Sequence, residues 1–474
     1  MIMRPFLTAL LLLAAPFVHA QLVFTLEECL KTAEQRNLAV LNAMLDAELA
    51  GRNEDQAFWD LAPDLNGVAT HGYNYGQTVD RFTNTFANDR VRTNQLFLQS
   101  NMVLFNGLRK QHRIRQAGLD SEAADKAVEA ALNDMRLEVV QAYLDVLGLR
   151  ERIKATEAQV ANTQEQLDLT EAMVEAGRMA RAELLTLQAQ LAQEEFNLTD
   201  VRNQHDQRKM ALGRAMQLEL NDVFTFDITA PEIAGFALTE PTASAEQVLA
   251  NVLANNPAYK QAELNVSSSE QGLSMARAGV IPTVTFSASA GSGYSGLTQR
   301  TVGEPVQGAP IPVGATASGE LVFVPNEINT FETVPFGDQL EQNFNQSVGL
   351  TLSVPIFNNL QNRVAIDRSR IQVEQTRNRM LAVRNDLQRN VLDALVAQRA
   401  AFRQYEAATR AVESGTLALA YAEERFAQGA ITSIELSAAK AQLNRNQAEQ
   451  INAKYQYLMA SKYLDILQGI PVTL

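Results

Sequence analysis

The side chains that most often carry catalysis are few in this sequence and lie far apart. The four histidines stand at positions 19, 71, 112 and 205, a spacing that matches no common pattern of metal-binding histidines. The sequence contains no P-loop, no HExxH motif and no CxxC motif. The segment Gly293-Tyr294-Ser295-Gly296-Leu297 lacks the final glycine of a nucleophile elbow. We therefore expect no enzyme, with no catalytic residue, no metal ion and no cofactor.

A long heptad pattern dominates the elements that could position any functional side chain. From Leu132 to Val174, apolar and small residues recur at alternating spacings of three and four. This pattern is typical of a helix that packs lengthwise on other helices. The helical run extends from Leu108 to about Ala176, so it would be on the order of 100 Å long. The same pattern recurs from Leu387 to Phe426, with Gln398 as the exception.

Landmark residues divide the chain into two similar halves. Phe105-Asn106 and Phe357-Asn358 lie 252 residues apart, and so do Gly177 and Gly429. Because glycine often ends a helix, we expect each long helix to turn back at its glycine and form a helical hairpin. The sequence therefore predicts the same long-helix unit twice.

The predicted boundaries follow from this repeat. Residues 1–20 have the charged start, short apolar run and small-residue cleavage site of a secretory signal peptide. Residues 21–212 form the first repeat, 213–243 an irregular connecting segment, and 244–474 the second repeat. Each repeat begins with a single short helix, expected at 26–58 and at 244–277.

The composition limits the partners of the chain. Its formal net charge of −14 argues against nucleic acid as a partner. The one cysteine, Cys29, excludes an internal disulfide framework, and we expect it to be a small buried apolar residue on the first helix.

Four extended segments have the length of tilted membrane strands. The last three are apolar on one face and rich in Ser, Thr, Asn or Gln on the other. A long loop rich in Gly and Pro, residues 291–343, separates the third strand from the fourth. The expected strands are about 65–75, 95–105, 283–292 and 345–356. The residues that we expect to face lipid are Leu96, Leu98, Val284, Phe286, Leu350 and Leu352.

An open sheet of four strands cannot lie in lipid, because its edges would leave backbone groups without hydrogen bonds. Single-chain barrels start at about eight strands, so several copies of the chain would have to share one barrel. Three copies would give twelve strands around a water-filled centre, whereas two copies would give eight strands and a nearly filled interior. The alternative is a soluble four-stranded sheet with one buried face.

The order of these elements resembles that of the TolC-like outer-membrane efflux proteins, over the whole mature chain. Val103-Leu104-Phe105-Asn106-Gly107 and Val354-Pro355-Ile356-Phe357-Asn358-Asn359 look like the strand-to-helix junctions of that family. The segments around Gly177 and Gly429 look like its periplasmic hairpin turns. No single motif is strong, but the doubled order is specific.

The resemblance implies a mainly α-helical homotrimer with a twelve-stranded transmembrane β-barrel in the outer membrane and a long α-helical tunnel in the periplasm. It also implies a periplasmic adaptor protein that docks on the tunnel tip and links it to an inner-membrane pump. The predicted function is the passive export of small molecules. A type I protein-secretion conduit is the alternative within this architecture. A structural or adhesive coiled-coil surface protein is the alternative from another class, although a stalk would not need duplicated glycine turns.

The resemblance also implies a set of site residues. In the family an acidic residue six positions after the second tip glycine lines the periplasmic entrance, and Glu435 and Glu183 fill that place in the two hairpins. The sequence departs from the family pattern at Ala438 and Ile431, where well-known members carry acidic and arginine residues, so Phe426 becomes a candidate gate residue. The plain alternative for both glutamates is a charge that favours a helix start. The expected adaptor-docking residues are Gly177, Arg178, Met179, Leu184, Gly429, Ala430, Ile431 and Leu436.

Overall fold

The computed structural model describes residues 23–80, 82–84, 86–87, 90–229 and 240–471. Contacts divide the chain into two compact units. The first unit comprises the segments up to Gly51, Leu119–Ser267 and from Glu374 onward, and the second comprises Arg52–Gly118 and Ser268–Val373. Each unit therefore combines parts of both sequence repeats. The predicted signal peptide, residues 1–20, lies outside the described residues.

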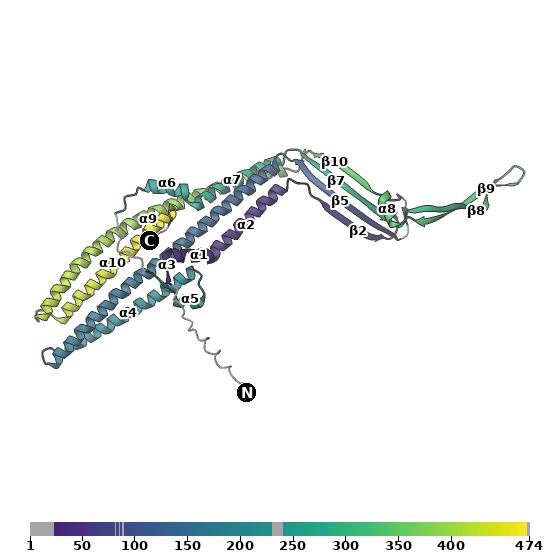
Figure 1. The fold of residues 1–474 in the computed structure, drawn as a ribbon. Helices are drawn as coiled ribbons and strands as arrows, with labels where there is room; N and C mark the ends of the chain where they lie inside the picture. The colour runs from purple at the N-terminus through teal and green to yellow at the C-terminus, as the bar shows by residue number, and fades with distance from the viewer. Residues whose placement is uncertain (1–22, 81, 85, 88–89, 230–239, 472–474) are drawn as a thin grey trace, which may run out of the picture. The chain divides into compact units, whose positions relative to one another are not determined.

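The predicted pair of long helical hairpins is confirmed. Helices α3 (Arg109–Glu175) and α9 (Gln361–Ala427) have 67 residues each. Helices α4 (Arg181–Ala215) and α10 (Ser433–Leu467) have 35 residues each and run back along α3 and α9 (Figure 1). Both pairs of helices begin 252 residues apart, the offset that the sequence landmarks predict.

The prediction of one short helix at the start of each repeat is wrong. The first repeat has two, α1 (Leu26–Arg36) and α2 (Leu38–Trp59). The second repeat has α6 (Ala245–Asn255) and α7 (Pro257–Ala278). The predicted start is confirmed, because Thr25 and Glu28 form a capping box at the beginning of α1.

An asparagine causes each break. The Asn37 side chain accepts hydrogen bonds from the backbone N–H groups of Ala39 (2.9 Å) and Val40 (3.2 Å). Asn256 occupies the same place before α7, and its side chain accepts a bond from the N–H of Ala258 (3.0 Å). Asparagine is a favoured N-cap, so each of these residues ends one helix and starts the next.

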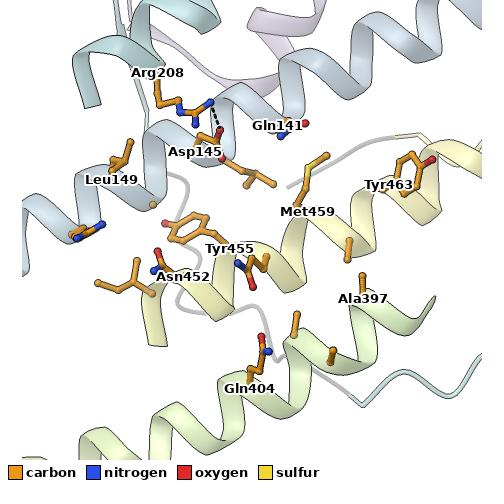
Figure 2. Close-up of a pocket in the computed structure, with 18 of the residues that line it drawn as sticks. Gln141, Asp145, Leu149, Arg208, Ala397, Gln404, Asn452, Tyr455, Met459 and Tyr463 are labelled. Atoms are coloured by element: carbon orange, nitrogen blue, oxygen red, sulfur yellow. Dashed lines mark ion pairs between the residues drawn. The ribbon is translucent and has the colours of Figure 1, made fainter. Parts of the chain in front are cut away.

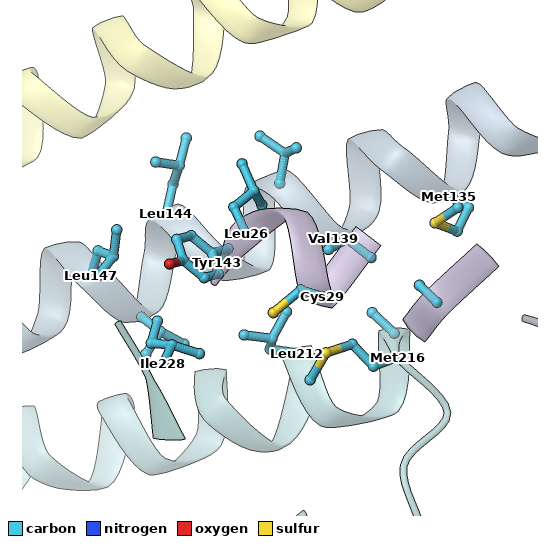
Figure 3. Close-up of a cluster of buried hydrophobic side chains, with 14 of the residues drawn as sticks. Leu26, Cys29, Met135, Val139, Tyr143, Leu144, Leu147, Leu212, Met216 and Ile228 are labelled. Carbon is cyan, nitrogen blue, oxygen red and sulfur yellow. The ribbon is translucent and has the colours of Figure 1, made fainter. Parts of the chain in front are cut away.

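The first unit contains a core where α1, α3 and α4 meet (Figure 3). Cys29 is fully buried there, as predicted, and burial together with nearby Glu28 raises the pKa of its thiol to about 12. The Tyr143 hydroxyl donates a hydrogen bond to the Thr229 carbonyl (2.7 Å). A second core joins α6, α9 and α10. Repeat-related residues occupy the two cores, as Val139 and Val391 illustrate.

The connecting segment is more ordered than predicted. It includes α5 (Leu220–Thr225) and the short strand β6 (Asp227–Ile228). Strand β6 pairs in parallel with β1 (Val23–Phe24), so this segment ties the start of the described chain to the first core.

The second unit contains an antiparallel sheet with the strand order β10-β7-β5-β2. Its strands are β2 (Asn66–Asn74), β5 (Val91–Phe105), β7 (Thr283–Ser295) and β10 (Asn345–Ser353). All four predicted strands are therefore present, although β5 starts four residues before its predicted start at 95. Strand β10 ends before Pro355, which has no backbone N–H to donate.

The predicted long loop between the third and fourth strands is wrong. It contains a hairpin of β8 (Gln299–Ala315) and β9 (Leu321–Thr333), followed by the short helix α8 (Phe336–Gln342). The pairing shifts register between Val302 and Val306 and again between Gly308 and Ile311. These irregularities accommodate the Pro and Gly residues of the segment, because bulges tolerate residues that a regular ladder does not.

The first repeat has a much smaller turn at the corresponding place. There β3 (Thr78–Val79) pairs with β4 (Phe86–Ala87). Helices α1 and α6 begin 219 residues apart, whereas α3 and α9 begin 252 apart, so the second repeat has 33 more residues between its short and long helices.

None of the helices within the described ranges combines the length and the apolar composition that crossing a membrane requires.

Candidate functional site

The first hairpin turns through a glycine with a left-handed backbone. Gly177 has φ of +69°. Its N–H donates to the Val174 carbonyl (3.0 Å), and the N–H of Arg178 donates to the Met173 carbonyl (2.8 Å). This is a Schellman motif, which satisfies the last carbonyls of α3. Apart from the two adjacent residues, no atom of the described chain lies within 4 Å of the place that a Cβ atom would occupy at Gly177, so the backbone rather than crowding requires glycine.

The second hairpin turns in the same way. Gly429 has φ of +70°, and its N–H donates to the Phe426 carbonyl (2.9 Å). The N–H of Ala430 donates to the Arg425 carbonyl (2.9 Å). The space around a Cβ atom at Gly429 is also empty. Two copies of one turn therefore stand at the ends of the two hairpins.

Glu435 forms a capping box at the start of α10. Its carboxylate accepts a hydrogen bond from the Thr432 N–H (3.0 Å), and its own N–H donates to the Thr432 hydroxyl (3.3 Å). Its side chain is exposed. This geometry supports the plain interpretation of Glu435, in which its charge and hydrogen bonds stabilise the start of a helix.

Glu183 occupies the matching position of α4 but bonds differently. The N-cap of α4 is Ala180, whose side chain cannot accept a hydrogen bond. Glu183 is half-buried, and its Oε2 atom is buried without a hydrogen-bond partner in the described chain. The repeat therefore places two glutamates at equal positions in unequal surroundings.

The other predicted tip residues divide by exposure. Leu436 is only 2% exposed, so it packs inside the chain rather than on the tip surface. Ile434, which was not predicted, is 69% exposed beside it. Exposed residues of the predicted set are Gly177, Arg178, Gly429 and Ala430, and half-buried ones are Met179, Leu184, Phe426 and Ile431.

A polar contact joins the two helical hairpins near their turns. Lys440 of α10 is 5% exposed, and its ammonium group donates a hydrogen bond to the Gln166 side chain of α3. Burial lowers the pKa of Lys440, while the charges of Glu423 and Glu194 act in the opposite direction. Lys440 was not predicted as a site residue, although its position gives a signal: it falls between the buried residues Leu436 and Leu443 on one stripe of α10.

Glu194 of α4 belongs to the same region. Its Oε1 atom accepts hydrogen bonds from the side chains of Gln159 (3.0 Å) and Gln190 (2.9 Å). The Gln190 side chain also accepts a hydrogen bond from the Ser437 hydroxyl of α10. Polar side chains from α3, α4 and α10 therefore hold the hairpins side by side.

A hollow of about 950 Å³ lies between the hairpins farther from their tips (Figure 2). Asp145 of α3 and Arg208 of α4 form an ion pair at its wall (3.4 Å), and burial raises the pKa of Asp145 against the opposing effect of Arg208. Tyr455 of α10 packs on Gly148 of α3, where only a small residue fits. No group of three or more His, Cys, Asp or Glu side chains in the described ranges is arranged to hold a metal ion.

The sheet places the predicted lipid-facing residues on one face. Leu350 lies opposite Phe286, and Phe286 lies opposite Met102. Leu352 lies opposite Val284 in the same register. Leu96, Leu98, Leu350 and Leu352 are all exposed in the single chain.

The other face of the sheet is mostly polar, although Val68, Phe97 and Val103 also lie on it. The hydroxyls of Ser289 and Ser347 form a hydrogen bond across β7 and β10 (2.9 Å), and Gln99 lies opposite Ser289. In the described part of the chain, the edge strands β2 and β10 each pair on one side only. The sheet is thus amphipathic and open at both edges.

Comparisons with solved structures show a shared fold. The outer membrane protein VceC of Vibrio cholerae superposes with a TM-score of 0.74 at 16% identity, over 94% of this chain and 96% of its own. The Campylobacter jejuni CmeC outer membrane channel gives a TM-score of 0.74 at 15% identity, over 94% and 85% of the two chains. CusC gives 0.75 at 15% identity, over 94% and 92%.

A sequence relative is the pyoverdine export outer membrane protein OpmQ of Pseudomonas putida. It is 23% identical over 362 residues, which cover 75% of this chain. The match spans 66% of the length of OpmQ, slightly less than two thirds. Residues 29–216 and 248–469 match the outer membrane efflux protein family, whose members are passive channels rather than enzymes. The chain therefore belongs to the outer membrane efflux protein family, the TolC-like channels.

Proposed function

We propose that three copies of this chain form the outer-membrane channel of a tripartite efflux system. The observation that carries the proposal is the amphipathic four-stranded sheet, which is open at both edges and belongs to a chain with two matching long helical hairpins. Open edges cannot remain unpaired in lipid, so they need partners.

The sheet order supports closure by copies of the same chain. Neighbouring strands are antiparallel from β10 to β2, so β10 of one copy can pair with β2 of the next without breaking the alternation. Twelve strands from three copies would enclose a water-filled channel, with the face that carries Leu350 toward lipid and the face that carries Ser289 toward water.

The helical hairpins would form the tunnel in the periplasm. The two glycine turns carry exposed residues at the hairpin ends, including Arg178 and Ile434, and these are available to a periplasmic adaptor protein. The adaptor would connect the tunnel to an inner-membrane pump. Glu183, Glu435 and Phe426 would lie near the tunnel entrance.

The proposed cargo is small molecules. The relative OpmQ exports pyoverdine according to its name, and this supports the export of small molecules over the export of proteins. We further propose that residues 1–20 direct export of the chain and are removed, so that the mature chain reaches the outer membrane.

The oligomer mass tests the proposal. Native mass spectrometry of the detergent-purified protein should give three times the mass of the mature chain. A well-folded protein with the mass of one chain would contradict it, because a single open sheet cannot form the barrel. A mass of two chains would mean that the barrel has eight strands rather than twelve.

A further inference from the structure

The face of the sheet that carries Leu350 changes in character toward one end. Leu96 and Leu98 of β5 lie on this face, and so does Arg92, because alternate residues of a strand share a face. Tyr73 of β2 lies opposite Arg92. At the end of the sheet where β5 begins, apolar side chains therefore give way to a basic and an aromatic one.

The spacing along β7 places this change at a membrane boundary. Val284 lies in the last apolar row at the other end, opposite Leu352, and Tyr294 lies ten residues further along the same face, opposite Asn94. These residues, at roughly 3.3 Å each, extend roughly 33 Å along the strand, which a tilt of about 40° reduces to roughly 25 Å across the membrane. The apolar band of a membrane barrel is about that high. In the proposed barrel, Tyr294 and Arg92 therefore lie at the level of the lipid head groups.

Two arginines stack on tyrosine rings in this region. The Cζ atom of Arg92 lies 4.7 Å from the centre of the Tyr294 ring, and the Cζ atom of Arg90 lies 4.9 Å from the centre of the Tyr73 ring. Such cation–π contacts hold a guanidinium group by its face and leave its N–H edge open to other partners. We call Tyr73, Arg90, Arg92 and Tyr294 the arginine cluster.

The ring under Arg92 is fixed by packing. Tyr294 is only 8% exposed, and the centre of its ring lies 5.4 Å from that of Phe336 in α8. The Ser292 hydroxyl, on the same face of β7, donates a hydrogen bond to the Leu340 carbonyl of α8 (2.6 Å). Helix α8 therefore holds the Tyr294 ring in place, and the ring orients the guanidinium group of Arg92.

The positive charges of the arginine cluster have no opposite charge beside them among the described residues. Arg90 and Arg92 are exposed, and neither forms an ion pair with a carboxylate in the described ranges. Arg300 at the base of the β8–β9 hairpin is different, because it pairs with Glu332 (2.7 Å) and with Asp338 (3.3 Å). A cation beside hydrocarbon is costly without an opposite charge, so the cluster favours an anionic partner.

We infer that the arginine cluster binds the phosphate group of an anionic lipid in the outer leaflet. The planar guanidinium group matches two phosphate oxygens, and tyrosine rings favour the boundary between hydrocarbon and head groups. The outer leaflet follows because β5 leads into α3 at its other end, on the side of the proposed periplasmic tunnel. The net charge of −14 belongs to the whole chain, and charges are screened beyond about 10 Å at 0.1 M salt, so it does not decide binding at this cluster. The inference rests on the proposed function, because the cluster meets lipid only where this face of the sheet lies in the membrane.

Lipid binding to the purified oligomer tests the inference. Native mass spectrometry from detergent micelles with equal amounts of phosphatidylglycerol and phosphatidylcholine should show about fivefold more bound phosphatidylglycerol for the wild type. Arg90→Gln/Arg92→Gln should abolish this preference. The matched control Arg379→Gln/Arg384→Gln removes the same charge from exposed positions on α9 and should keep the wild-type ratio. Equal ratios in the wild type and in Arg90→Gln/Arg92→Gln would overturn the inference.

Two further samples separate the alternatives. Arg90→Lys/Arg92→Lys keeps the charge but removes the planar donor groups, so its ratio should be clearly smaller, and an unchanged ratio would overturn the role of the guanidinium groups. Inorganic phosphate in excess, at matched ionic strength, should leave the preference intact, whereas its loss would assign the arginines to free phosphate. A mass of three chains without the preference would refute the lipid site and leave the channel intact. A mass of one chain that keeps the preference would refute the trimer and retain the lipid site.

Discussion

Glu183 and Glu435 show how one position in a repeat can acquire two roles. Each glutamate stands six residues after a glycine that ends a long helix. Thr432 gives Glu435 a capping partner, whereas Ala180 gives Glu183 none. Without a capping partner, Glu183 keeps one carboxylate oxygen, Oε2, that is buried and has no hydrogen-bond partner in the described chain. At the residue scale, the carboxylate of Glu435 makes two contributions, the capping hydrogen bond and the negative charge, and each has to be tested separately.

Two substitutions of Glu435 separate these contributions. Glu435→Ala removes the capping box and should destabilise the start of α10 by about 0.5–2 kcal/mol. Glu435→Gln keeps a side chain that can form the box but removes the charge. Hydrogen exchange of the first turn of α10 should therefore increase in the Ala variant only. If block of the channel by divalent cations is lost in the Gln variant as well, the charge itself acts at the entrance.

The turn residues were predictable and their neighbours were not. Gly177 and Gly429 could be found from the sequence because only glycine adopts positive φ at little cost in such a turn. The burial of Leu436 and the partner of Lys440 depend on which face of α10 meets α3. Heptad spacing locates a packing face, but it does not identify the helix that covers it.

At the element scale, the two hairpins are joined by polar groups as well as apolar ones. Lys440 is buried with one hydrogen bond from its ammonium group to Gln166. Burial of a charge costs free energy that a neutral partner recovers only in part. The contact between the hairpins is therefore weaker than an apolar contact of the same size would be.

Lys440→Met should raise the stability of the protein at pH 7 by about 1 kcal/mol. Because burial lowers the pKa of Lys440 in the folded state, the unfolded chain binds more protons between that lowered pKa and the ordinary value of 10.5. The stability of the wild type should therefore rise with pH across this window, and its gap to the variant should shrink. Thermal unfolding between pH 7 and 10.5 measures the gap.

Lys154→Met is the matched control, because Lys154 is exposed on α3. It should change the unfolding midpoint little at any of these pH values. A Lys440→Met variant that is less stable than the wild type at pH 7 would contradict the account. That result would mean that the hydrogen bond to Gln166 and the attraction of Glu423 and Glu194 outweigh the cost of burial.

The elements were predictable where their pattern was long. Helices α3 and α9 follow from sustained heptads, and both repeats have the predicted offset. The breaks at Asn37 and Asn256 escaped prediction because the apolar pattern continues through them while one side chain caps the next helix. The β8–β9 hairpin escaped because its Pro and Gly residues, which indicate a loop, are accommodated at register shifts.

At the scale of the whole molecule, the sheet faces decide how copies would assemble. Leu350 and Thr351 are neighbours on β10 and point to opposite faces. In the proposed trimer Leu350 faces lipid and Thr351 faces the channel. The sequence could predict this alternation, but the strand order that leaves β2 and β10 at the edges required the structure.

Arginine at these two positions tests the face assignment. Leu350→Arg should destabilise the barrel in the membrane by about 2–4 kcal/mol if residue 350 lies near the middle of the bilayer. The yield of assembled oligomer in the outer-membrane fraction should therefore fall. Thr351→Arg should assemble normally and change the ion conductance. The reverse outcome would exchange the lipid and channel faces.

Single-channel conductance of the purified oligomer in a planar lipid bilayer tests the central claim most directly. The account predicts discrete pores whose conductance changes with Thr351→Arg, because that side chain would line the water-filled barrel. A folded trimer that forms pores with the same conductance in both proteins would contradict the assignment of this sheet to the channel wall. Removal of the helical turns around Gly177 and Gly429 would open an entrance that is closed at rest. A folded trimer that still forms no pores after this removal, in the wild type and in the variant, would contradict the conduit.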